Sequence, residues 1–195
     1  MKFEADIIRF LQGNLNSSWV IIFQIITLFG SVFGFIISFL LIFVKNKKLA
    51  FCLLASYLIV QFINKVLKRI IMRDRPFVGY DDIINYGGES GFSMPSGHSV
   101  GASLCFVFLI YHISSLNIQK GDKIIYGTSL LFLLFTIVLS RMVLGVHYLT
   151  DIICGIIMGI LFAIISILLY NVIVKKSRKT KVKRDNERNI ISNNK

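Results

Sequence analysis

Long stretches without a charged residue constrain this chain more than any other feature. Residues 19–44 contain no Asp, Glu, Lys or Arg, and four further apolar runs follow at 49–64, 97–119, 124–140 and 152–174. An α-helix needs about 20 apolar residues to cross the hydrocarbon core of a bilayer. Lipid admits only helices or closed barrels, and these continuous runs lack the alternation of barrel strands. The sequence therefore predicts an all-α, polytopic membrane helical bundle with five transmembrane helices.

Charge divides the chain into three parts. Residues 1–18 carry apolar side chains at helical spacing, which is typical of a helix that lies in the membrane interface. We expect residues 19–174 to form the membrane-embedded domain. Residues 175–195 hold nine Lys and Arg against two acidic residues, and we expect this basic tail to be disordered. Only 16% of the residues are charged and 55% are hydrophobic, which argues against an ordinary cytosolic domain.

Basic residues near the helix ends predict the orientation of the chain. Lysines lie at 45–48, at 120–123 and in the tail, and a five-span topology places all three regions on one side. We expect that side to be cytoplasmic, with the tail against anionic lipid. No aromatic residues interleave the charges of the tail as stacking partners would. The lipid bilayer is therefore an expected partner, nucleic acid is not, and no protein partner is implied.

Several cations at the opposite, outer helix ends run against the positive-inside trend. Five crowd the end of the second apolar run and one lies at the end of the fourth: Lys65, Lys68, Arg69, Arg73, Arg75 and Arg141. Ionisable groups near membrane depth are costly, which makes a functional site the default hypothesis. Snorkelling of long side chains to the interface is the alternative, and we favour it for Lys65 alone.

The segment Pro95-Ser96-Gly97-His98 opens the third run at the same outer surface. Proline suits the first turn of a helix, and Ser93 can cap it. The free backbone N–H groups at 96–98 would then form an anion site at the helix N-terminus. Gly97 has no side chain to block the approach of a phosphate. We therefore expect an anion to bind here.

His147 and Asp151 lie four residues apart at the outer start of the fifth run, hence on one helix face. The carboxylate can hold one imidazole nitrogen and leave the other free to attack. With fixed cations for the phosphate oxygens, these residues predict phosphoester hydrolysis through a phosphohistidine. One histidine attacks phosphorus and the other protonates the leaving oxygen. The opposite assignment of His98 and His147 stays open, but Asp151 favours His147 as the nucleophile.

A metal ion is not expected to take part. The sequence has no cluster of carboxylates or histidines at metal-ligand spacing. Three cysteines fall within the apolar runs and are interpreted as packing residues. We therefore expect metal-independent chemistry with no cofactor.

Three segments together resemble the motif of the type 2 phosphatidic acid phosphatase superfamily: Lys68-x6-Arg75-Pro76, Pro95-Ser96-Gly97-His98 and Ser140-Arg141-x5-His147-x3-Asp151. The resemblance covers about residues 19–174. It implies that Lys68, Arg75 and Arg141 hold the phosphate. It adds hydrogen bonds from Ser96 and the backbone of Gly97. It makes His98 the general acid, His147 the nucleophile and Asp151 its orienting partner. Members often have six spans, so the N-terminal segment is either a partial sixth element or the chain is a short form.

We therefore expect an integral membrane lipid phosphatase that acts on a lipid phosphate or diphosphate at the extracytoplasmic surface. Undecaprenyl diphosphate, phosphatidylglycerophosphate and phosphatidic acid are the substrates that the resemblance implies. Two alternatives to a lipid phosphatase remain. Vanadate-dependent haloperoxidases share the site but are generally soluble. A non-enzymatic lipid-binding or transport protein would place charges along a path through the bilayer. The 77–95 loop, rich in glycine and acidic residues, is a candidate lid or a plain solvated loop.

Overall fold

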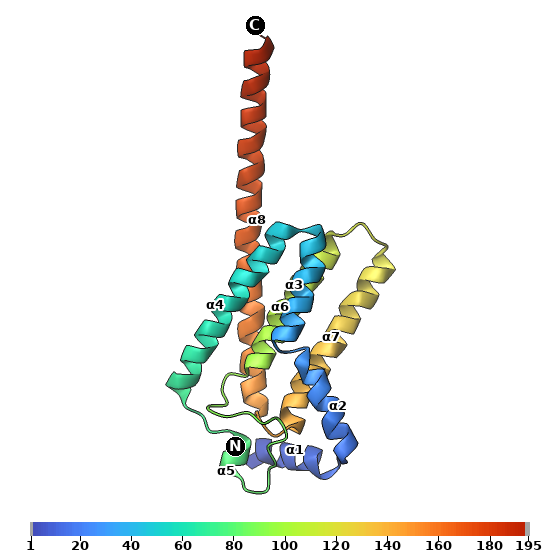
Figure 1. Cartoon of the computed structure of the whole chain (residues 1–195), viewed down its shortest axis with the longest axis vertical. Helices are drawn as coiled ribbons and strands as arrows, with labels where there is room; N and C mark the ends of the chain where they lie inside the picture. The colour runs from blue at the N-terminus through green and yellow to red at the C-terminus, as the bar shows by residue number, and fades with distance from the viewer. Residues whose placement is uncertain (1, 194–195) are drawn as a thin grey trace.

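The computed structural model describes residues 2–193, with side chains described up to residue 177. All regular structure in the described part is helical (Figure 1). The elements are α1 (Lys2–Gly13), α2 (Ser17–Leu28), α3 (Val32–Lys45), α4 (Lys47–Ile71), α5 (Pro76–Gly79), α6 (Gly97–Ser115), α7 (Lys120–Val143) and α8 (Leu149–Asn193). The predicted all-α bundle is confirmed.

Helix α6 is the central element of the bundle. It packs against α3, α4, α7 and α8, and apolar residues such as Val100, Leu104 and Phe108 are fully buried on it. A helix that is apolar all round buries all its faces in this way. Small residues bring α8 close to the start of α6: a Cβ on Gly155 would lie 2.7 Å from the carbonyl oxygen of Ser96. This close approach fixes the beginnings of α6 and α8 side by side.

Four helices are long and apolar enough to cross a membrane, and α2 with α3 forms a fifth candidate if this pair is one span. The expectation of one unbroken helix over 19–44 is wrong, because the pair bends by 45° between Leu28 and Val32. The side chain of Ser31 accepts a hydrogen bond from the N–H of Phe33 and caps a new helix there. The chain is therefore a multi-pass membrane protein with four candidate spans, or five if the bent α2–α3 pair is one of them.

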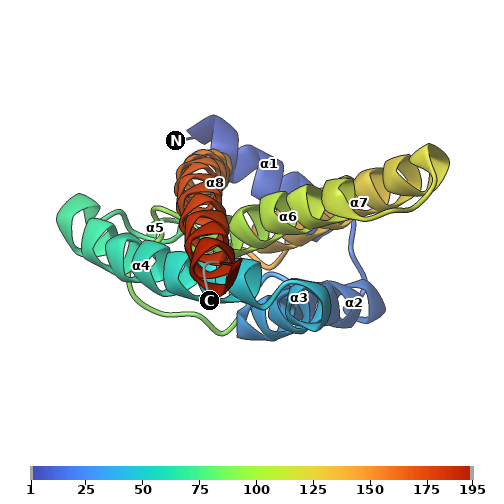
Figure 2. The same ribbon diagram turned by 90° about the horizontal axis from the view of Figure 1, so that it is seen from above.

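Helix α1 lies across one end of the bundle, nearly at right angles to the long helices (Figure 1; Figure 2). It buries Ala5 and Ile8, whereas Phe3 and Phe10 are exposed. Its last turn is tied to the 80–96 loop, because the side chain of Gln12 donates to the carbonyl oxygen of Ile84 at 2.8 Å. The N-terminal segment therefore covers part of the same end at which the sequence motifs gather.

Helix α8 runs far beyond the bundle at the end opposite to α1 (Figure 1). The lysine-bearing connections at 45–47 and 116–120 lie at that end too. Helical backbone continues through residues 175–193, where the sequence analysis expects a disordered tail. The two ends of the bundle thus separate the basic tail from the motif residues.

Candidate functional site

Four helix ends meet at the α1 end of the bundle and carry the three motifs. The end of α4 leads to Arg75, the start of α6 carries His98, the end of α7 carries Arg141, and His147 directly precedes α8. Each motif lies where a helix begins or ends, so small shifts of the connecting loops set the mutual distances. The structure brings residues separated by more than 70 positions into one site.

Two buried guanidinium groups form the cationic part of the site. Arg75 is 4% exposed and Arg141 is 1% exposed. Three carbonyl oxygens hold the Arg75 guanidinium at 2.9–3.1 Å, and they belong to Ser90, Gly91 and Val146. Arg141 donates to the hydroxyl of Thr27 on α2 at 2.6 Å. Burying a charge is costly unless it is paired, so these guanidinium groups need an anion in contact with them.

The anion in contact with them is the carboxylate of Glu89, from the loop between α5 and α6. Oε2 lies 2.8 Å from Nη1 of Arg75, and Oε1 contacts Nη2 of Arg141. Nδ1 of His98 lies 3.6 Å from Oε1, and Nε2 of His147 lies 3.7 Å from Oε2. One carboxylate is therefore surrounded by two arginines and two histidines.

Glu89 stays ionised in this position. Burial works to raise its pKa, but His147 and the charges of Arg141 and His98 outweigh burial and hold the pKa well below its usual range. In the sequence, Glu89 belongs only to the 77–95 loop, the candidate lid. No periodicity or spacing links this residue to the motifs, so only the folded chain shows its contact with them.

His147 and Asp151 lie close together as predicted, but not on one helix face, because α8 begins only at Leu149 and His147 precedes it. Nδ1 of His147 lies 3.5 Å from Oδ2 of Asp151, while its Nε2 faces Glu89. Asp151 is completely buried, and its Oδ2 also accepts from the N–H of Tyr148 at 2.9 Å. The 3.5 Å separation is long for a hydrogen bond. Catalytic hydrogen bonds often tighten only when the substrate binds.

A second carboxylate stands behind Asp151. Arg73 donates to Oδ1 of Asp151 at 2.5 Å and to Oε2 of Glu4 at 2.9 Å. Glu4, on α1, also accepts from the N–H and the hydroxyl of Thr150. The Arg73 guanidinium lies 4.2 Å from the ring centroid of Tyr148. Arg73, one of the outer cations of the sequence, is therefore paired with two carboxylates.

The pKa of Glu4 follows from these contacts. Burial works to raise the pKa of Glu4. Hydrogen bonds from Thr150 and the charge of Arg73 lower it by more, so the pKa lies below its ordinary value. Glu4 lies outside all three motifs, so it is not among the site residues that the sequence predicts. An acidic residue in the first turn of a helix is normally interpreted as favourable to the helix dipole, so nothing marked Glu4 as a site residue.

Lys68 lies at the border of the site rather than against Glu89. Its Nζ donates to the carbonyl oxygens of Phe92 and Ser93 at 2.8 and 2.9 Å. These carbonyls belong to the segment that leads into α6. Lys68 therefore anchors the chain just before Ser96. This segment keeps Lys68 close to the anion position of the site.

The start of α6 differs in detail from the expected geometry. Ser96, not Ser93, is the N-cap, and its side chain accepts from the N–H of Ser99. Ser93 instead bonds to carbonyl oxygens of 73–74, and Pro95 precedes the helix rather than occupying its first turn. The N–H of Ser96 donates to the carbonyl oxygen of Asp151 at 3.0 Å, so it is not free for an anion. The close packing of α8 on α6 explains this bond.

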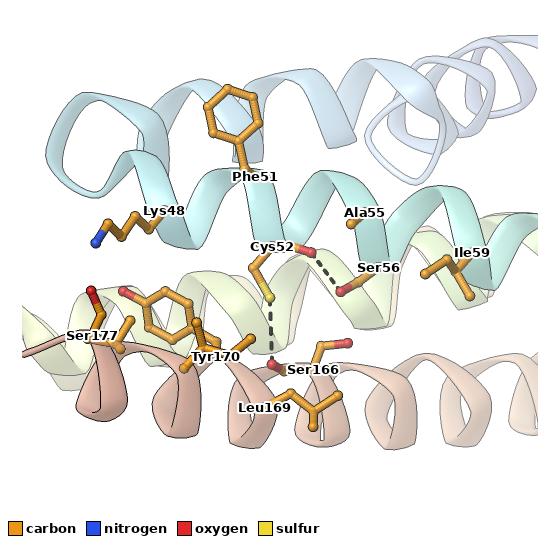
Figure 3. A pocket seen from close by; sticks show the side chains of 12 residues that line it. Lys48, Phe51, Cys52, Ala55, Ser56, Ile59, Ser166, Leu169, Tyr170 and Ser177 are labelled. Atoms are coloured by element: carbon orange, nitrogen blue, oxygen red, sulfur yellow. Dashed lines mark hydrogen bonds between the residues drawn. The ribbon is translucent and has the colours of Figure 1, made fainter. Parts of the chain in front are cut away.

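Pockets lie along the described membrane-spanning helices, and two of them differ in their relation to the site. One has a volume of about 390 Å³ and lies at the bend between α2 and α3, lined by Gly30, Ser31, Val32, Tyr57, Gln61, Gly97 and His98. The other has a volume of about 560 Å³, lies between α4 and α8 and opens beside Lys48 (Figure 3). Its lining, within the described residues, includes none of the predicted site residues. The first of these pockets is continuous with the site, through His98.

Metal ligands do not gather in the part of the chain that the structure describes. Over these residues no group of three or more His, Cys, Asp or Glu side chains is placed to hold a metal ion. The acidic side chains of the site are each engaged by arginine. The arrangement can bind an anion and supplies imidazole groups beside it.

The fold and the site together define a multi-pass helical membrane protein with an arginine- and histidine-lined anion site at one end. The family model of the PAP2 superfamily matches residues 49–175, which include all three motifs. The chain belongs to this superfamily.

Curated relatives and solved structures agree with this assignment. Phosphatidylglycerophosphatase B of Bacillus subtilis (strain 168) is 36% identical over 105 residues, which are 52% of this chain and 48% of the relative. Dolichyldiphosphatase of Saccharomyces cerevisiae is 32% identical over 122 residues, 61% of this chain and 51% of the relative. The matched region thus spans about half the length of both curated relatives.

Two crystal structures share the fold. That of the first transmembrane PAP2 type phosphatidylglycerolphosphate phosphatase from Bacillus subtilis has a TM-score of 0.74 and 24% identity, and the match covers 90% of this chain and 86% of that one. That of Aquifex aeolicus LpxE has a TM-score of 0.69 and 22% identity, covering 83% and 93%. The helical arrangement is therefore that of known membrane proteins of this type.

Proposed function

We propose that this protein is an integral membrane lipid phosphatase that hydrolyses the terminal phosphate of a lipid phosphate or diphosphate. The observation that carries the proposal is the convergence of Arg75, Arg141, His98 and His147 on one anionic group, Glu89. Guanidinium groups suit the non-bridging oxygens of phosphate, and the histidines suit attack and proton transfer. The names of both curated relatives denote phosphatases, which supports the same conclusion.

In the first step of the proposed reaction, Nε2 of His147 attacks phosphorus. A nitrogen–phosphorus bond forms while the bond from phosphorus to the lipid oxygen breaks, and His98 donates a proton to that oxygen. Asp151 stabilises the positive charge that develops on His147. Arg75 and Arg141 hold the non-bridging oxygens as their charge increases.

In the second step, water attacks the phosphohistidine. His98 takes a proton from the water, the nitrogen–phosphorus bond breaks, and inorganic phosphate leaves. Among the described residues, Lys68, Ser96 and the backbone of Gly97 complete the proposed phosphate site. The chemistry requires no metal ion, because the arginines supply the positive charge.

The pocket beside His98 is the proposed position of the leaving lipid. His98 lines that pocket together with apolar and small residues of the α2–α3 bend. A lipid oxygen bound there would lie next to the proposed general acid, with its chain directed into the bilayer. The bend between α2 and α3 leaves this position open, since an unbroken helix would pack along it.

We also propose that the site faces the extracytoplasmic side and that the tail is cytoplasmic. The lysine-bearing connections and the tail share one end of the bundle, and the site lies at the other (Figure 1). The positive-inside trend supports this orientation. Undecaprenyl diphosphate, phosphatidylglycerophosphate and phosphatidic acid are the proposed substrates.

The test is phosphate release by the purified protein in detergent, measured with these three lipids in excess chelator. We expect the wild type to release phosphate and His147→Ala to lose at least about 10³-fold in rate, because it lacks the nucleophile. His112→Ala is the matched control, since this histidine is buried at the far end of α6. Equal release by wild type and His147→Ala would overturn the mechanism, and loss of activity in chelator would overturn metal independence.

A further inference from the structure

Glu89 contacts the site in the way a phosphate would. Each of its two oxygens faces one arginine and one histidine: Oε1 contacts Arg141 and lies 3.6 Å from His98. Oε2 lies 2.8 Å from Arg75 and 3.7 Å from His147. Two carboxylate oxygens are thus divided between two guanidinium groups, as two non-bridging phosphate oxygens are.

The contact with His147 makes the two anions mutually exclusive. Oε2 lies in front of Nε2, the nitrogen proposed to attack phosphorus. A phosphorus atom cannot approach that nitrogen while the carboxylate stays. Any phosphate that reacts must therefore take the position of Glu89.

We propose that Glu89 is a further residue of the phosphate site, an internal competitor that neutralises Arg75 and Arg141 and is exchanged for the phosphoryl group. The inference rests on the proposed function. Buried guanidinium groups without an anion are strongly destabilising, so a carboxylate from the chain protects the protein between turnovers. The same carboxylate lowers the affinity for substrate and product by one common factor, because both must displace it.

Rotation of the Glu89 side chain is sufficient for the exchange. The backbone on its C-terminal side is held, since the carbonyls of Ser90 and Gly91 bind Arg75. The side chain is 25% exposed, so it has a route to solvent. Gly88 and Gly91 lie on either side of it with φ angles of 63° and 72°, and a Cβ added to either glycine would meet no atom within 4 Å. The loop backbone can therefore stay in place while the carboxylate leaves.

The test compares Glu89→Gln and Glu89→Ala with the wild type, using inorganic phosphate and orthovanadate as probes. We expect both inhibition constants and the KM for phosphatidic acid to fall by about tenfold or more, and by similar factors. Charge-assisted hydrogen bonds of ordinary strength account for a change of that size. Asp81→Asn is the matched control, because it removes one negative charge from an exposed position of the same loop.

A merely structural role of Glu89 gives the opposite pattern. It raises KM or lowers kcat and leaves the inhibition constants unchanged or higher, and this result overturns the inference. The melting temperature supplies a second measurement that needs no turnover. We expect the phosphate-free variants to melt below the wild type and to gain more from added phosphate than the wild type does.

The two proposals fail in different ways. One outcome is that the variants bind phosphate more tightly but the wild type hydrolyses no lipid phosphate. This outcome contradicts the proposed function and still supports Glu89 as the competitor. Hydrolysis by the wild type with unchanged phosphate affinity in both variants contradicts only the competitor. If the phosphate-free variants unfold, their recovery in excess phosphate supports the inference, and failure to recover overturns it.

Discussion

Both ends of the bundle carry basic residues, but these residues are exposed at one end and buried at the other. At the α3–α4 connection Lys45, Lys47 and Lys48 are exposed. At the opposite end Arg75 and Arg141 are buried and held by carbonyls, a hydroxyl and Glu89. Exposed lysines contribute little to stability and suit anionic lipid, whereas buried arginines held by fixed partners form a candidate binding site. Position and burial, rather than the number of charges, separate a topology signal from a site.

The largest effect that tests this contrast is expected at the buried end. Arg141→Gln removes a guanidinium that would hold the phosphate, and we expect kcat/KM to fall about 10²- to 10³-fold. Phosphate release from a lipid phosphate measures the change, and Lys47→Gln at the other end is the control. Similar losses in the two variants would abolish the distinction between the ends.

The orienting carboxylate gives the next largest effect. Asp151→Asn keeps the shape but removes the charge that would stabilise His147 as it attacks, and we expect kcat to fall about 10²-fold or more. Steady-state kinetics measure it, with the circular dichroism spectrum as the check on folding. A variant with normal kcat would show that His147 needs no orienting partner.

Glu4 extends the site into the N-terminal helix. Glu4→Gln weakens the support of Arg73 and Thr150 behind Asp151, and we expect kcat to fall about tenfold with KM nearly unchanged. The matched control is Asp6→Asn, also on α1, whose carboxylate pairs with Arg9 on the exposed side. A change in KM alone would instead assign Glu4 to substrate binding.

Acid should destabilise the end of the bundle that carries the site. The pKa values of Glu4 and Glu89 are lowered in the folded protein, so the unfolded chain binds more protons as the pH falls below the usual carboxyl range. Their contribution to stability is complete above about pH 4.3 and is lost as the pH drops towards the folded values. Melting temperatures measured across this range should fall less steeply for Glu89→Gln. Parallel curves would contradict the assignment.

The smallest effect is expected at the end of the bundle that carries the exposed lysines. The substitution Lys48→Gln changes a residue that lines the apolar pocket between α4 and α8 (Figure 3), at the end of the bundle opposite to His98 and His147. We expect a change of less than about 0.5 kcal/mol in stability and unchanged kcat. The same assay and melting curves measure both. A large loss of activity would show that this pocket takes part in the reaction.

The sequence predicted the helical bundle and the residues of the motifs because both follow from local patterns. Long apolar runs define spans, and the short spacing of His147 and Asp151 keeps the two residues close, although His147 lies just before the helix that carries Asp151. The break at Ser31 escaped prediction, because an uncharged run carries no signal that separates one helix from two. Contacts between distant segments escaped it too: Glu89 reaches the site from a loop without periodicity and Glu4 from the N-terminal helix, and only tertiary packing fixes their partners.

Trapping the covalent intermediate tests the central claim most directly. A lipid phosphate with a labelled terminal phosphoryl group is mixed with the protein in chelator and quenched within one turnover. The account predicts an acid-labile, base-stable label on His147 of the wild type and its absence from His147→Ala. Rapid turnover without labelled protein, or an equal label on His147→Ala, would contradict it.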